Sequence, residues 1–166
     1  YIEISWTPGA DLGGYTLEQW STTALSGTYT FPAGTVLGPN GTAIIAVGQL
    51  GASQPSPANF YYHGNGSFSS TWGSTTAAGR VIKDPSGAIV EAVGYGTYAF
   101  PAAANVDSTL WSGNTPGVSS SGNRLEGAYT RSAANWINSG VSPQTPNELN
   151  PGIVLPAPGG PTRSRL

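Results

Sequence analysis

The chain has 166 residues, a net charge of −2 and no cysteine. This length fits one domain with its own core, and the lack of cysteine excludes disulfides, thiolate metal sites and cysteine nucleophiles. Charged residues make up only 8% of the chain, so no basic stripe predicts a nucleic-acid partner, and no apolar run of about 18 residues predicts a membrane span.

Short β-prone runs between frequent glycines and prolines dominate the first part of the chain. They predict strands over residues 1–6, 14–20, 27–31, 35–37 and 42–47. Tyr15, Leu17 and Gln19 fall on one face of the second run. The run 42–47 is continuously apolar, which is typical of a strand in the middle of a sheet.

The second part of the chain continues the same pattern. Further strands are predicted over 59–63, 79–83, 88–95 and 124–131, with a short terminal element from Trp136. Asp84-Pro85-Ser86-Gly87 favours a type I turn in a hairpin. Only 101–106 suits a helix, of one turn at most. The spacing predicts an all-β sandwich or barrel, followed by an extended Pro/Gly-rich tail over 151–166.

Several blocks with a defined order carry a family resemblance. These blocks are YIEI at 1–4, LGGYTL at 12–17, YTFPAGTVLGP at 29–39, DPSGAIVEAVGYG at 84–96, Arg124, Trp136 and TPNELN at 145–150. The block at 29–39 is the most specific. Together they resemble lamin-tail domains of the secreted microbial type, with Tyr15 in place of a family tryptophan and Asn147 in place of a glycine.

The resemblance implies an immunoglobulin-like β-sandwich over residues 1–150. Two long loop insertions, 48–78 and 97–122, depart from the compact family pattern and hold much of the aromatic and Ser/Gly content. The family implies its fold firmly and its function loosely. Its microbial members are modules of secreted or surface proteins, sometimes beside hydrolases.

Catalytic and metal-binding residues are sparse in this sequence. His63 is the single histidine, so we expect no catalytic triad and no zinc site. Asp11, Asp84 and Asp107 lie in turn-like sequence, where an aspartate caps its own turn more readily than it binds calcium. We therefore expect no enzymatic activity, no metal and no cofactor.

Aromatic residues in the insertions are the candidate binding residues: Trp72, Trp111, Tyr61 and Tyr62. A loop tryptophan can stack on a sugar or anchor a protein interface. The alternative is that it folds back over the edge of the sandwich. Asn40 and Asn65 each begin a glycosylation sequon that is also an ordinary Asn-Gly turn.

Two segments are candidates for assembly. The N-terminal strand offers Tyr1, Ile2 and Ile4, and the tail offers Ile153, Val154 and Leu155. Few charges remove a common defence against edge-to-edge strand pairing, and a neighbouring copy can add a strand to a free edge. We expect a non-enzymatic extracellular structural protein of the cell surface, forming homo-oligomers or homopolymers. The alternative is a carbohydrate- or protein-binding adhesion module that recognises glycans.

Overall fold

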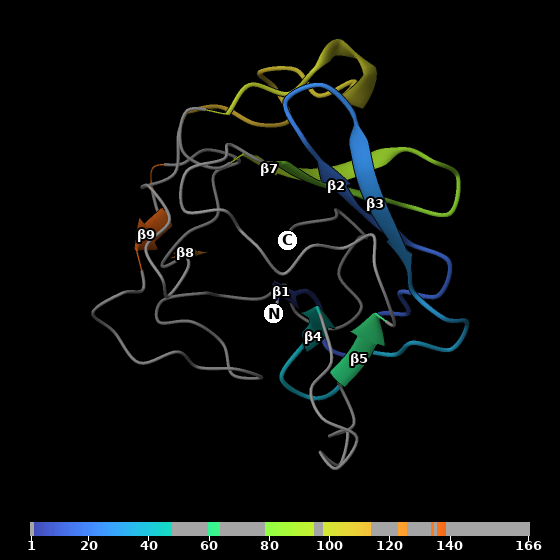
Figure 1. Ribbon diagram of the computed structural model, residues 1–166. Helices are drawn as coiled ribbons and strands as arrows, with labels where there is room; N and C mark the ends of the chain where they lie inside the picture. Colours follow the sequence, from blue (N-terminus) through green and yellow to red (C-terminus); the bar gives the residue numbers. More distant parts are fainter. Residues whose placement is uncertain are drawn as a thin grey trace.

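The computed structural model describes residues 2–47, 60–63, 79–94, 98–113, 123–125, 134 and 136–138. This part of the chain is mostly β (Figure 1). Its elements are β1 (Ile2–Ser5), β2 (Thr16–Trp20), β3 (Leu25–Thr30), β4 (Thr42–Val47), β5 (Phe60–His63), β6 (Gly79–Lys83), β7 (Ile89–Gly94), the 3-10 turn η1 (Ala102–Ala104), β8 (Asn123–Leu125) and β9 (Trp136–Asn138).

The described strands form three open sheets. A four-stranded sheet has the order β3-β2-β6-β7 and is antiparallel throughout. A three-stranded sheet has the order β1-β4-β5, in which β1 is antiparallel and β5 parallel to β4. The third sheet is the antiparallel pair β8-β9. The predicted all-β class is confirmed, and β4 lies in the middle of its sheet as its apolar run predicts.

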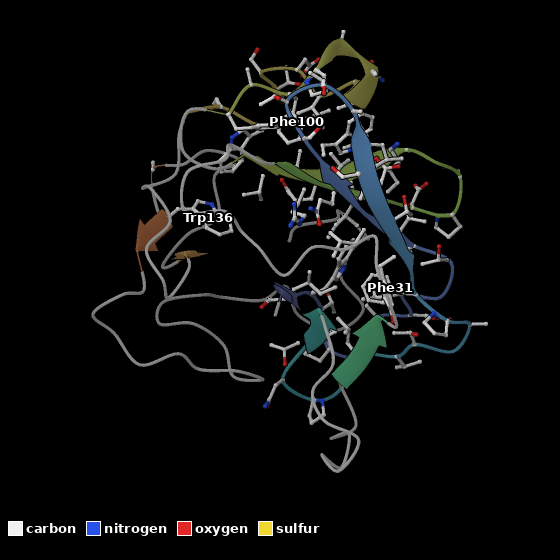
Figure 2. All side chains as sticks on the ribbon, viewed as in Figure 1. Phe31, Phe100 and Trp136 are labelled. Atoms are coloured by element: carbon white, nitrogen blue, oxygen red, sulfur yellow. The ribbon has the colours of Figure 1, made fainter. Side chains whose placement is uncertain are left out.

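The first core cluster contains side chains from both larger sheets. Ile4 and Ala43 come from β1 and β4, whereas Leu17 and Ile82 come from β2 and β6. Phe31, 1% exposed, joins them from the chain just after β3. Figure 2 shows Phe31 on the side of the four-stranded sheet that faces β4 and β5. Burial of the Ile, Leu and Phe side chains, each worth roughly 1.5–3 kcal/mol, ties the two sheets to one core.

The opposite face of the four-stranded sheet carries a second core cluster. Trp20, Val81 and Ala92 from β2, β6 and β7 pack there against residues 98–113, which we call the cover segment. The cover segment lies over this face (Figure 1). The strands β2, β6 and β7 are therefore largely buried on both faces, whereas β3 is exposed on one face, and part of the predicted second insertion is a layer of the fold.

Glycines allow the cover segment to approach the sheet closely. The rings of Tyr98 and Phe100 lie over Gly79, and the indole of Trp111 lies over Gly94. A Cβ atom at Gly79 would overlap both rings that cover it. Tyr98 and Phe100 also contact one another edge to face, with ring centroids 4.8 Å apart. Because glycine has no side chain, the aromatic rings can pack directly against the backbone at these two positions.

Turn chemistry agrees with the sequence. Gly87 donates its backbone N–H to Asp84 O at 2.9 Å and has φ of +87°, so the predicted hairpin between β6 and β7 is confirmed. The predicted helical turn is confirmed as η1. Residues 35–37 form an isolated bridge between Val36 and Asp11 instead of a strand, because Gly34, with φ of +76°, and the turn at 38–41 leave only three residues between them.

Candidate functional site

The backbone of β1 has two distinguishable sides. Trp6 donates its N–H to Gly41 O at 2.7 Å, and the β1-β4 register pairs Ile4 with Ala43 and Glu3 with Ile44. Backbone groups alternate in direction along an antiparallel pair. Ile2 and Ile4 therefore direct their N–H and C=O toward β4, whereas those of Glu3 and Ser5 point to the outer side.

The outer side of β1 has no strand partner among the described residues. β1 pairs only with β4 among the described strands, and the structure shows no hydrogen bond from the outward groups of Glu3 or Ser5 to any described residue. Ser5 is partly exposed. Thr28 in β3 and Val90 in β7, the outer strands of the four-stranded sheet, have further interaction partners. An open row of N–H and C=O groups is a template for another strand.

The structure refines the roles of the predicted assembly residues. Ile4 is 7% exposed and belongs to the first core cluster, so its side chain holds β1 to its own subunit. Ile2 lies in β1. Tyr1 and the tail residues Ile153, Val154 and Leu155 lie outside the described residues. The outward backbone groups of β1 are those of Glu3 and Ser5. The alternation of an antiparallel strand gives this direction once the partner strand is known.

Of the predicted binding aromatics, Trp111 is the one whose side chain the structure describes. Trp111 is 6% exposed and packs in the second core cluster, with its ring centroid 6.2 Å from that of Trp136. Folding back over the sheet is the interpretation that this position supports. Tyr61 and Tyr62 lie in β5, where only the backbone is described, and Trp72 lies outside the described residues.

The three turn aspartates act as local caps. Oδ1 of Asp11, Asp84 and Asp107 accepts the backbone N–H of Gly13, Ser86 and Thr109, respectively, at 2.8–2.9 Å. This confirms the predicted Asx turns. Hydrogen bonds from the hydroxyls of Ser86 and Thr109 hold the pKa values of Asp84 and Asp107 below the usual range. Within the described ranges, no three acidic or histidine side chains gather as a metal site would require.

The turn interpretation of Asn40 is also supported. Gly41 donates its N–H to Gly38 O at 2.9 Å with φ of +64°, which places Asn40 in an exposed turn. Asn65, the second sequon, lies outside the described residues.

Buried polar side chains line both faces of the four-stranded sheet. Glu18 accepts hydrogen bonds from Lys83 Nζ at 2.7 Å and from the indole N–H of Trp20 at 2.8 Å. On the opposite face, Gln19 lies beside Arg80 in the β2-β6 register, and both are buried. Glu91 is buried in β7. This burial could not be predicted from the sequence, because isolated polar residues in short strands also fit a solvent-exposed face.

The comparisons with known proteins add no relative. A scan against protein-family models and a search of curated proteins both find no match. No helix in the described part of the chain is long and apolar enough to cross a membrane. Within the described ranges, the outward backbone groups of Glu3 and Ser5 in β1 are the candidate contact surface.

Proposed function

We propose that this chain is a non-enzymatic structural protein of the cell exterior that associates with other copies through its sheet edges. Its fold is then an immunoglobulin-like sandwich similar to lamin-tail domains, formed by the β1-β4-β5 and β3-β2-β6-β7 sheets. The placement outside the cell rests on the resemblance to secreted microbial domains and on a composition low in charge and rich in Ser, Thr and Asn.

The sandwich proposal is supported by the first core cluster. Side chains of β1 and β4 pack there with side chains of β2, β3, β6 and β7. A two-layer β fold buries the inner faces of both its sheets in one such core. The block 29–39, which carries the strongest resemblance, supplies Tyr29, Phe31 and Leu37 to this cluster.

The observation that carries the assembly proposal is the outward backbone of Glu3 and Ser5 in β1. Natural proteins protect such edges with lysines, prolines, bulges or covering loops. β1 contains neither lysine nor proline, and its register with β4 runs without a bulge. Glu3 is its single charge. Strand addition at this edge extends an existing sheet, with affinity supplied by main-chain hydrogen bonds.

Sedimentation velocity of the full chain over a wide concentration range tests the assembly proposal. We expect species larger than the monomer whose share grows with protein concentration. Electron microscopy of the same samples then separates closed oligomers from filaments. A single monomeric species at the highest concentration overturns the proposal, and selective glycan binding by that monomer favours the adhesion-module alternative.

A further inference from the structure

We propose that Asn40 is the acceptor of an N-linked glycan that is attached before the chain folds. The inference rests on the proposed placement outside the cell and adds a modification to it. Asn40-Gly41-Thr42 has the Asn-x-Thr pattern that N-glycosylation requires, with glycine at the middle position. The positions of these residues in the fold support the proposal and set its timing.

Asn40 lies in a surface turn, where a folded protein can accommodate a bulky glycan. It is exposed in the turn of residues 38–41, which Gly41 closes by donating its N–H to Gly38 O at 2.9 Å. Pro39, which precedes Asn40, is exposed as well and fixes its own φ. Gly41, with φ of +64°, then leads the chain into β4. The turn thus presents the acceptor residue to solvent.

Thr42, which supplies the hydroxyl of the motif, has the opposite environment. It is the first residue of β4, pairs with Ser5 of β1 and is fully buried. Both Asn40 and Thr42 have further interaction partners in the folded chain. Because the motif requires a Ser or Thr hydroxyl, the transferring enzyme must reach that group. The modification therefore precedes the pairing of β4 with β1.

The transfer joins Asn40 to the first sugar of a lipid-linked oligosaccharide. The side-chain nitrogen of Asn40 attacks the anomeric carbon of that sugar, and the bond from this carbon to a phosphate oxygen of the lipid carrier breaks. The lipid phosphate leaves with the electron pair, and the amide nitrogen loses one proton. The step needs no oxidant or reductant.

A glycan at Asn40 compensates for the low charge of the chain. Charged residues make up only 8% of the sequence and the net charge is −2, so charge repulsion contributes little to solubility. Trp6 donates its N–H to Gly41 O at 2.7 Å, and Ser5 pairs with Thr42. The glycan therefore lies at this end of the β1-β4 pair and keeps it hydrated.

Peptide mapping of the chain purified from the cells that produce it tests the modification. Release of the glycan by a peptide amidase in heavy-oxygen water converts a modified Asn40 into aspartate that carries the label. A parallel sample without the amidase measures spontaneous deamidation of the Asn-Gly sequence. We expect labelling at this position to depend on the amidase.

Two matched variants assign the glycan to its site. Asn40→Gln removes the acceptor, and Asn65→Gln removes the other sequon of the chain. We expect the label at position 40 and the glycan mass that it reports to be lost in Asn40→Gln and kept in Asn65→Gln. The same glycan mass in Asn40→Gln as in the unmodified chain overturns the inference.

A purified transferase with its lipid-linked donor tests the timing. The unmodified chain is either diluted from denaturant directly into the reaction or folded beforehand. We expect Asn40 to be modified in the first case and the modification to be lost in the second. Equal modification of the folded chain overturns attachment before folding.

The mapping experiment also separates this inference from the proposed function. A secreted chain that is unmodified at Asn40 overturns the inference and leaves the proposed function intact. A chain that remains inside the cell overturns the proposed placement and this inference with it.

Discussion

The phenolic hydroxyl of Tyr98 donates a hydrogen bond to the carbonyl oxygen of Ser21 at 2.8 Å and fastens the cover segment to the end of β2. Ser21 also begins the turn to β3, where its own N–H is donated to Ala24 O at 2.8 Å. A residue of the cover segment thus satisfies a carbonyl at the tip of the β2-β3 hairpin. The contact links the two parts of the chain that border the second core cluster.

Replacement of Tyr98 by Phe should remove this hydrogen bond and preserve the ring packing over Gly79. The carbonyl of Ser21 then loses its partner, and we expect the free energy of unfolding to fall by about 1 kcal/mol. Chemical denaturation at neutral pH measures the change. An unchanged unfolding midpoint would mean that water replaces the hydroxyl without cost.

Tyr98 also predicts a loss of stability at alkaline pH. Burial raises the pKa of its hydroxyl to about 12, whereas an unfolded chain ionises tyrosine near pH 10. The unfolded state therefore loses a proton first, and the stabilisation present below pH ~10 declines as the pH rises toward ~12. The Tyr98→Phe variant should show a shallower decline. A residual decline is expected from Tyr15, whose pKa burial also raises.

The close packing of Tyr98 and Phe100 against Gly79 predicts that Gly79→Ala lowers the stability of the fold. The added methyl group overlaps both rings, so either the cover segment or β6 must move. Overpacking of this kind costs roughly 1–3 kcal/mol, which thermal or chemical unfolding would report. In a Phe100→Ala background the same substitution should cost less, because one overlapping ring is gone. An equal loss of unfolding free energy in both backgrounds would show that Gly79 and Phe100 are not energetically coupled.

Substitution of Trp111 tests whether this ring stabilises the core or serves ligand binding. Its ring is buried, and its indole N–H makes no hydrogen bond to a described residue. We expect Trp111→Ala to lower the free energy of unfolding by about 3–5 kcal/mol and Trp111→Phe to lower it by about 1–2 kcal/mol. Denaturant titration measures both. A Trp111→Ala variant as stable as the unmodified chain would show that the ring is dispensable to the core.

The capped aspartates predict how stability falls in acid. The pKa values of Asp84 and Asp107 are lowered chiefly by hydroxyl hydrogen bonds from Ser86 and Thr109. A lowered pKa contributes stability above the unfolded value, near pH 4, and that contribution is lost as the pH falls through the folded value. The double variant Asp84→Asn, Asp107→Asn should lose less stability between neutral and acidic pH. A parallel pH profile for both proteins would refute this.

Local features of the fold followed from the sequence where short-range chemistry decides them. The continuous apolar run 42–47 placed β4 in the middle of a sheet. Asp84, Pro85 and Gly87 specified the hairpin turn, and Gly34 and Gly41 mark backbone conformations with positive φ that side chains disfavour. These positions depend on the residue itself and its immediate neighbours, so no knowledge of the tertiary structure was needed.

The cover segment did not follow from the sequence because its packing is non-local. Residues 98–113 have neither strand alternation nor a helical period, and the positions they pack against are glycines in β6 and β7. The candidate functional site likewise depends on non-local packing. The outward direction of Glu3 and Ser5 depends on which residues of β1 face β4, and the tertiary pairing alone decides this. Charge and composition favoured pairing at a strand edge without identifying the backbone groups that point outward.

Burial of β2, β6 and β7 on both faces has a consequence for engineering. A compact version of the domain, trimmed of everything that exceeds a minimal two-sheet fold, would remove residues 98–113 as a dispensable loop. That deletion would leave Trp20, Val81 and Ala92 on an uncovered apolar surface, which is a liability for aggregation. Grafting and domain fusion should therefore treat the cover segment as an obligatory part of the domain boundary.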